Sequence, residues 1–137
     1  MENEIPLPAP PTDGVTACRF APDGESLLVS SWDSSLSLYS TAPSKPPALL
    51  SRTSHPHPLL DCDVLPLSSS SSIAAVSGGL DGVVRLHELH ADGRAPTACP
   101  RELGSHASAA RCVRACAALG PSLAVSGSWD GTLRLWD

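Results

Sequence analysis

Four side chains near the C-terminal end of the chain could form either a hydrolytic site or a structural hydrogen-bond network. They are His106, Ser126, Asp130 and Trp136. Serine, histidine and aspartate make up a hydrolase triad, but the G-x-S-x-G turn that presents a nucleophilic serine is missing here. A carboxylate at a tight turn needs donors, and the indole N–H can only donate. The hydrolytic interpretation is therefore not supported, and we expect the protein not to be an enzyme.

Cysteine and histidine offer a second possible chemistry, the binding of a metal ion. The chain has five cysteines and no C-x-x-C pair, which argues against a zinc ribbon or a redox motif. His106, Cys112 and Cys116 remain possible ligands. The alternative is that these cysteines are small apolar core residues, a common role for free thiols. We favour that alternative and expect no metal ion and no cofactor.

Composition limits the class of partner. The 137 residues carry a net charge of −5, so the chain lacks the basic footprint of a nucleic-acid binder. No segment approaches the roughly 18 apolar residues of a membrane span. The first residues are acidic and then proline-rich, unlike a leader peptide. We expect one small domain in the cytosol or nucleus, with no nucleic-acid and no membrane partner.

The elements that would position these side chains are repeated hairpins. Asp33, Asp81 and Asp130 are 48 and 49 residues apart. Each follows a run of small and apolar residues, is followed directly by Gly or Ser, and precedes an alternation of apolar and polar residues. This pattern predicts a strand, a tight turn and a second strand.

A further alternating segment precedes each hairpin, at residues 15–20, 59–64 and 110–115. Each is followed by a loop signal, namely residues 21–24, Pro66 with the serine tract 68–72, and Gly120-Pro121. Each repeat thus has three strands and a linker long enough for a fourth. The alanine-rich residues 107–119 favour a helix by propensity, but we predict a strand because the other two repeats have one at this position.

Two biased segments also admit two interpretations. The serine tract is interpreted as a surface turn, the alternative being a phosphorylation platform. The proline-rich residues 6–11 and 43–47 are interpreted as an N-terminal arm and a loop between strands. The alternative is that they are polyproline II ligands.

The repeat period, the Asp-Gly turn and the closing Leu-Arg-Leu-Trp-Asp at 133–137 resemble the WD40 repeat. This resemblance implies an all-β fold, a partial β-propeller of about three blades of four-stranded antiparallel sheets. Its units would be a proline-rich arm at 1–11 and repeats at 12–50, 51–98 and 99–137. The third repeat would lack its fourth strand. Such an open arc exposes sheet edges and is expected to be only marginally stable.

In the WD40 family a hydrogen-bonded tetrad ties each blade together, and the resemblance carries it onto this chain. The third repeat has all four members: His106, Ser126, Asp130 and Trp136. The second repeat has His55, Ser77 and Asp81, with His87 in place of tryptophan. The first repeat keeps only Asp33, with Pro11, Val29 and Tyr39 at the other positions. We expect packing and ladder bonds to hold these two blades.

A narrower resemblance rests on an ordered set of motifs. They are Leu-Leu-Val-Ser-Ser-Trp-Asp at 27–33, Leu-Asp-Cys at 60–62, Ser-Gly-Gly-Leu-Asp at 77–81, Arg-Cys-Val at 111–113 and Gly-Ser-Trp-Asp at 127–130. Together they resemble the first three repeats of Bub-type mitotic-checkpoint proteins. The WD40 mRNA-export factors are similar but fit two of these signatures less well.

The resemblance implies a non-enzymatic scaffold of the mitotic spindle assembly checkpoint. Family members bind a short peptide motif, called GLEBS, in the checkpoint kinase and in its pseudokinase-like relative. They also bind a kinetochore scaffold protein. The implied location is the nucleus, at the kinetochore of chromosomes, with the cytoplasm as a further possibility. The alternatives are an mRNA-export adaptor that binds a nucleoporin and a substrate adaptor of a ubiquitin ligase.

Trp32 and Trp129 match the family's peptide-binding positions, and Leu80 stands at the equivalent place in the second repeat. An indole at the rim offers a large apolar area and one donor, and tryptophan is enriched at binding hot spots. The alternative is that both indoles pack on neighbouring loops. The basic cluster that would pair with acidic groups of a peptide is not evident in the sequence.

Overall fold

The computed structural model describes residues 3–65, 72–95, 99–116 and 123–137. Within these ranges the chain forms eleven strands and no helix, so no helix could cross a membrane there. The strands are β1 (Val15–Phe20), β2 (Ser26–Ser31), β3 (Ser35–Ser40), β4 (Ala48–Ser54), β5 (Leu59–Val64), β6 (Ser72–Gly79), β7 (Val83–His90), β8 (Arg101–Ser105), β9 (Ala110–Cys116), β10 (Leu123–Ser128) and β11 (Leu133–Trp136).

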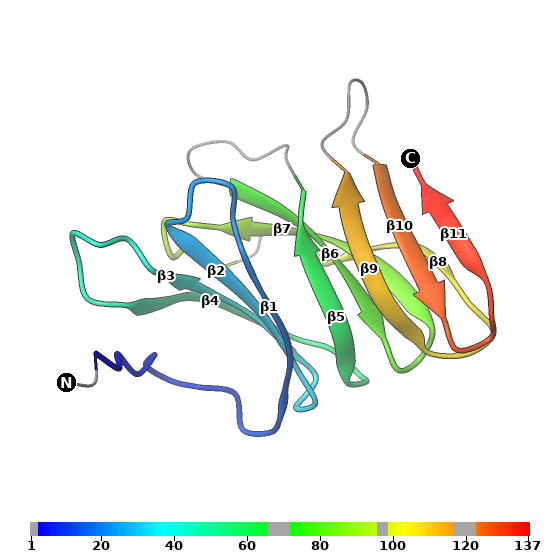
Figure 1. Cartoon of the computed structure of the whole chain (residues 1–137), viewed down its shortest axis with the longest axis horizontal. Coiled ribbons are helices and arrows are strands. Elements are labelled where there is room, and N and C mark those ends of the chain that lie inside the picture. Colours follow the sequence, from blue (N-terminus) through cyan, green and yellow to red (C-terminus); the bar gives the residue numbers. More distant parts are fainter. Residues whose placement is uncertain (1–2, 66–71, 96–98, 117–122) are drawn as a thin grey trace.

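The strands form three antiparallel sheets that follow one another along the chain (Figure 1). The first sheet is β1-β2-β3-β4, the second is β5-β6-β7-β8, and the third consists of β9, β10 and β11 in the described residues. This confirms the all-β class and the partial propeller. The sheets are offset from the predicted sequence repeats. Strand β4 of the first sheet extends across residue 50, from the first predicted repeat into the second. Strand β8 of the second sheet lies after residue 98, within the third predicted repeat.

The local predictions can be compared with these strands. Residues 110–116 form a strand despite their alanine content, because β9 pairs along its length with β10. Residues 21–24 form a turn, closed by a hydrogen bond from Gly24 N to Ala21 O. Residues 43–47 lie in the loop between β3 and β4. Residues 68–71 of the serine tract, Pro66 and Gly120-Pro121 lie outside the described residues.

The same tight turn occurs in all three hairpins. The residue after the aspartate has a positive φ in each: 71° for Ser34, 81° for Gly82 and 83° for Gly131. Its N–H donates to the carbonyl three residues earlier in every case. Glycine adopts this left-handed conformation without a steric penalty, whereas Ser34 carries a Cβ. The first hairpin is therefore the strained copy.

A β-bulge also recurs at one place in every sheet. The register shifts between Val15 and Ala17 in β1 and between Leu59 and Asp61 in β5, and β9 shifts at the corresponding point opposite Gly127 and Ser128. The extra residues are Thr16, Leu60 and Arg111. Because a bulge breaks the alternation of side chains across a strand, it can redirect the extra residue.

The three sheets pack face to face. One core, between the first and second sheets, includes Leu28, Leu38, Cys62 and Ala75. A second core, between the second and third sheets, includes Val76, Val84, Val113 and Ala124. Strand register makes Leu28, Val76 and Val125 equivalent positions. The first two are fully buried, whereas Val125 is 38% exposed, on a face of the third sheet that also presents Leu133 and Leu135.

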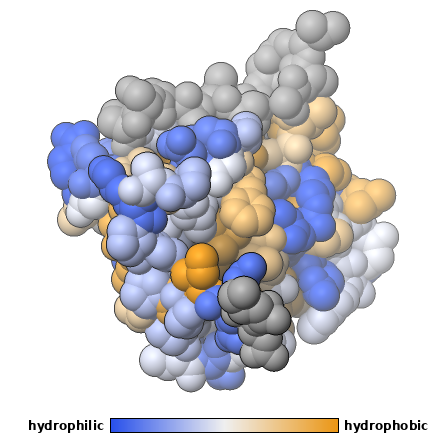
Figure 2. All heavy atoms as spheres, turned by 60° about the vertical axis from the view of Figure 1, so that its left-hand side comes forward, coloured by the Kyte–Doolittle hydropathy of each residue, from blue (hydrophilic) through white to orange (hydrophobic). Residues whose placement is uncertain are grey.

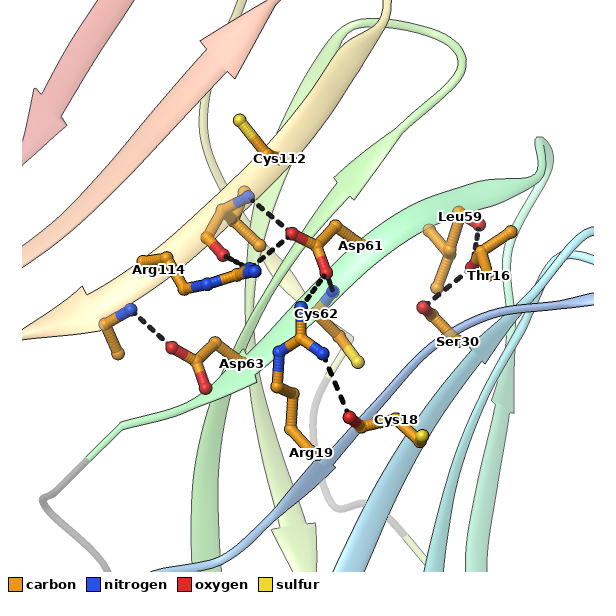
Figure 3. A network of polar contacts seen from close by, with 12 residues as sticks. Thr16, Cys18, Arg19, Ser30, Leu59, Asp61, Cys62, Asp63, Cys112 and Arg114 are labelled. Atoms are coloured by element: carbon orange, nitrogen blue, oxygen red, sulfur yellow. Dashed lines mark hydrogen bonds and ion pairs between the residues drawn. The ribbon is translucent and has the colours of Figure 1, made fainter.

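An acidic side chain joins the three inner strands (Figure 3). Asp61 of β5 is buried and accepts hydrogen bonds from Arg19 of β1 at 3.1 Å and from Arg114 of β9 at 2.6 Å. Its Oδ2 also accepts the backbone N–H of Val113 at 3.0 Å. Nearby, Asp63 accepts the N–H of Ala115 at 2.8 Å. We call Asp61, Arg19 and Arg114 the inter-sheet clasp.

The N-terminal arm lies against the free face of the first sheet, which belongs to the side of the molecule that comes forward in Figure 2. Tyr39 donates its hydroxyl to Ala9 O at 2.9 Å, and Arg52 donates to the same carbonyl at 2.6 Å. A cavity of about 250 Å³ remains between the arm and the sheet, lined by Leu7, Pro10, Pro11, Val15, Cys18, Leu27, Val29 and Tyr39.

Candidate functional site

The predicted network of the third repeat forms a continuous chain of hydrogen bonds. Trp136 donates its indole N–H to Ser126 Oγ at 2.8 Å, and Ser126 Oγ lies 2.7 Å from His106 Nε2. His106 Nδ1 lies 2.9 Å from Thr132 Oγ1, which donates to Asp130 Oδ1 at 2.6 Å. The structure thus brings all four predicted residues together. It adds Thr132, which the sequence analysis missed.

The direction of these bonds fixes the tautomer of His106. Thr132 uses its only hydroxyl proton on the carboxylate, so His106 Nδ1 must carry the proton that it shares with Thr132. In the tautomer with the proton on Nδ1, Nε2 accepts the hydrogen bond of the Ser126 hydroxyl. Since both ring nitrogens are occupied within the network, His106 has none left for a metal ion. In the described residues no group of three or more histidine, cysteine or acidic side chains could hold one.

The second repeat has a different network. Ser77 Oγ lies 2.7 Å from Nε2 of His87, the residue that replaces tryptophan. His55 does not reach Ser77; its ring packs edge-on against His87 with centroids 5.1 Å apart. Burial lowers the pKa of His55 to about 4 and the pKa of His87 to about 3. Both rings are neutral near pH 7, and His55 Nε2 and His87 Nδ1 have no hydrogen-bond partner among the residues that the structure describes.

The turn aspartate of the second repeat has a different hydrogen-bond partner from those of the other two repeats. The reason is the residue that comes directly after the histidine position of each repeat. Asp33 accepts the backbone N–H of Thr12 at 2.9 Å, and Asp130 accepts that of Ala107 at 2.9 Å. The corresponding residue of the second repeat is Pro56, which has no N–H. Asp81 instead pairs with Arg85 at 2.7 Å.

The surroundings of these carboxylates keep them ionised. Burial raises the pKa of Asp33, but hydrogen bonds from Ser35 and Thr12 outweigh it and lower the pKa to about 2. Hydrogen bonds from Thr132 hold the pKa of Asp130 well below its ordinary value. Each aspartate therefore closes its turn as an anion near neutral pH.

The two predicted rim tryptophans line one pocket of about 150 Å³, together with Thr16, Leu60 and Arg111. The last three are the bulge residues of the three inner strands. Trp32 and Trp129 are 43% and 61% exposed. Both indoles line the same pocket. Leu80, the equivalent residue of the second repeat, does not line the pocket.

Backbone hydrogen bonds hold this rim in place. The N–H of Trp32 donates to Gly14 O at 2.9 Å, and the N–H of Trp129 donates to Ala109 O at 3.1 Å. Below them, Thr16 Oγ1 donates to Leu59 O at 2.7 Å and lies 2.8 Å from Ser30 Oγ (Figure 3). The residues of the pocket therefore lie at strand ends that hydrogen bonds hold in place.

The described lining of the pocket consists of side chains suited to contact with a ligand. Its lining consists of two indoles, a leucine, a threonine hydroxyl already bonded on both sides, and a guanidinium. Among the residues that the structure describes, no histidine, cysteine or carboxylate lines this pocket to act as base or nucleophile. Two flat apolar walls with a few polar groups suit an extended peptide.

Comparison with known proteins is consistent with this arrangement. The family profile described as WD40, WD domain, G-beta repeat, matches residues 6–40 and 97–137. The chain is 28% identical over 138 residues to the Poly(A)+ RNA export protein of Schizosaccharomyces pombe, covering 100% of this chain and 36% of that protein.

Two relatives carry checkpoint names. Mitotic checkpoint protein BUB3.1 of Arabidopsis thaliana is 33% identical over 131 residues, which cover 96% of this chain and 34% of that protein. Mitotic checkpoint protein bub-3 of Caenorhabditis elegans is 31% identical over 139 residues, which cover 98% and 36%. The chain spans about a third of the length of the relatives it matches.

Proposed function

Because the family profile matches more than half of its residues, this chain belongs to the WD40 repeat family, and we propose that it is a non-enzymatic scaffold that binds a short peptide between Trp32 and Trp129. The observation that carries the proposal is the shared pocket. Two exposed indoles, 97 residues apart in sequence, face one cavity together with the three bulge residues. Exposed tryptophans bury a large apolar area on binding and often dominate the binding energy.

We assign this peptide binding to the mitotic spindle assembly checkpoint. The partners would be the checkpoint kinase and its pseudokinase-like relative, each through a short GLEBS-type motif, and a kinetochore scaffold protein. The protein would then act in the nucleus, at kinetochores. Support comes from the checkpoint relatives of Arabidopsis thaliana and Caenorhabditis elegans, at 33% and 31% identity, and from the ordered motifs described above.

An adaptor in mRNA export is the second candidate. The export protein of Schizosaccharomyces pombe and the mRNA export factor GLE2 of Chaetomium thermophilum match all of this chain at 28% and 29% identity. These values are too close to those of the checkpoint relatives to separate the two roles. Under this candidate the same pocket would bind a nucleoporin peptide.

Fluorescence anisotropy with two labelled peptides tests both candidates. One peptide carries the GLEBS motif of a checkpoint kinase and the other the corresponding motif of a nucleoporin. Tighter binding of the kinase peptide supports the checkpoint assignment, and tighter binding of the nucleoporin peptide supports export.

In either case, Trp32→Ala and Trp129→Ala should each weaken binding roughly tenfold or more. Leu80→Ala is the matched control, since it truncates the equivalent rim position outside the pocket. Equal affinities of the unaltered chain and the double tryptophan variant would refute the proposed site.

A further inference from the structure

We propose that two copies of this chain associate head-to-tail, with the outer face of the third sheet of one copy packed on the free face of the first sheet of the other. The first and third sheets stand at opposite ends of the row of sheets (Figure 1). Each therefore presents one face that no other described sheet covers. This association goes beyond peptide binding, and the residues that carry it do not line the tryptophan pocket.

The outer face of the third sheet repeats a surface that the chain buries twice. In each sheet, three apolar positions on the second and third strands lie on the face towards the next sheet. They are Leu28, Leu36 and Leu38 in the first sheet and Val76, Val84 and Leu86 in the second. All are fully buried except the half-buried Leu86. The equivalent Val125, Leu133 and Leu135 of the third sheet are 38%, 78% and 69% exposed.

The free face of the first sheet repeats the complementary surface. In the other two sheets, two positions on the first strand pack against the preceding sheet and are buried. They are Leu59 and Cys62 in β5 and Ala110 and Val113 in β9. Strand register makes Val15 and Cys18 of β1 their equivalents. Both are exposed, Val15 by 57%, and the cavity beneath the N-terminal arm reaches both.

A small residue also recurs where neighbouring sheets approach most closely. Gly78 of β6 lies against β9, and a Cβ on it would come within 2.6 Å of Ala110 O. Strand register makes Gly127 the equivalent residue on the outer face of the third sheet. Because Val15 is equivalent to Ala110, it would be the residue that approaches Gly127 from the second copy. Glycine leaves room for such an approach of one backbone to another.

The number of copies follows from the number of sheets. Contact between two unlike faces either closes into a ring or continues as a filament. Propellers typically contain about four to eight blades. Two copies of three sheets each fall within this range, whereas three copies exceed it. We therefore commit to a closed dimer, in which every exposed face is covered, and a filament becomes an outcome of the test.

Size-exclusion chromatography with light scattering measures the mass of the full chain across the micromolar range. The expected mass is twice the 14.1 kDa of one chain. Leu135→Glu places a charge on the face of the third sheet, and Val15→Glu places one on the face of the first. Each side chain is exposed within one copy, so the fold should tolerate the charge. Each variant should raise the Kd of the dimer by roughly tenfold or more, because an unpaired charge is costly to bury.

Leu80→Glu is the matched control. It adds the same charge at an exposed leucine in the turn between β6 and β7, away from both faces. Its dimer should be as tight as that of the unaltered chain. Far-ultraviolet circular dichroism of each variant verifies that the strands are retained.

Mixing the two face variants distinguishes unlike from like faces. Leu135→Glu keeps the first-sheet face intact, and Val15→Glu keeps the third-sheet face intact. The mixture can therefore restore one of the two contacts. Native mass spectrometry should detect a heterodimer that is weaker than the unaltered dimer but tighter than the dimer of either variant alone.

Three results would overturn the inference. A chain that stays monomeric at every concentration excludes the association, and a mass that grows beyond two copies excludes the closed ring. If Leu135→Glu weakens the dimer and Val15→Glu does not, the third sheets pair with each other and the head-to-tail arrangement is wrong. Peptide binding between Trp32 and Trp129 is measured separately, so the proposed function can stand or fail whatever the result.

Discussion

Substitution of Ser126 by alanine is expected to be much more destabilising than the same change at Ser77. The Ser126 hydroxyl has two partners, the indole N–H of Trp136 at 2.8 Å and His106 Nε2 at 2.7 Å. The Ser77 hydroxyl has one, His87 Nε2 at 2.7 Å. Both serines are almost completely buried, so burial does not distinguish them.

The magnitude follows from the groups left without partners. An unsatisfied buried polar group costs roughly 1–3 kcal/mol. Ser126→Ala leaves two such groups, but Trp136 is only partly buried and its N–H can reach water. We expect a loss of about 2–4 kcal/mol for Ser126→Ala and about 1–2 kcal/mol for Ser77→Ala. For a chain of this size, 1 kcal/mol corresponds to roughly 4 °C in the midpoint of thermal unfolding.

Urea titration at low temperature, followed by near-ultraviolet circular dichroism, measures both variants under conditions that favour the folded state. Trp136→Phe provides an internal check, because it removes the indole donor and leaves the Ser126–His106 bond in place. Its loss should be smaller than that of Ser126→Ala. The reasoning is refuted if Ser77→Ala is as destabilising as Ser126→Ala. The second hydrogen bond of Ser126 would then add nothing to the stability of the chain.

Three further predictions concern other parts of the fold. Ser34→Gly should stabilise the chain by up to about 1 kcal/mol in urea unfolding, because φ of 71° penalises a Cβ; destabilisation would contradict the strained turn. His55 and His87 have folded pKa values of about 4 and about 3, below the unfolded value near 6.5. Their contribution to the free energy of unfolding is therefore complete above pH 6.5 and is lost as the pH falls towards 4. Stability measured from pH 6.5 to pH 5 should therefore fall, and less steeply in His55→Leu; equal slopes would refute the role of His55. Tyr39→Phe removes the hydrogen bond to Ala9 O and should speed proteolytic cleavage within residues 3–11, whereas unchanged cleavage would show that Arg52 alone holds the arm.

Much of the fold could be predicted because local signals agreed with one another. The Asp-Gly turns and the alternation around them specified hairpins, and the strand of residues 110–116 followed from comparison of the repeats against its own helix propensity. Sequence spacing placed Trp32 and Trp129 at equivalent positions. It could not show that they share a cavity, because that depends on the stacking of the first and third sheets around the second.

The rest depended on interactions that no local pattern encodes. The bulges that redirect Thr16, Leu60 and Arg111 arise from pairing with the neighbouring strand, so Arg111 could not be recognised as a pocket residue. His55 was predicted to join Ser77 and Asp81, but it packs against His87 instead, and Asp81 pairs with Arg85. Pro56 was the available signal, since a residue without an N–H cannot serve the turn aspartate.

The inter-sheet clasp has a consequence for folding during synthesis. Ribosomes deliver the chain from its N-terminus, so Asp61 emerges 52 residues before Val113 and 53 residues before Arg114, and Arg19 emerges earlier still. Until β9 arrives, Asp61 Oδ2 lacks the two donors that satisfy it in the finished structure. Burying that carboxylate without these donors would be costly, so we expect Asp61 to become fully buried only when β9 packs against β5. The contacts that join the sheets at Asp61 would then be completed only when the third sheet forms.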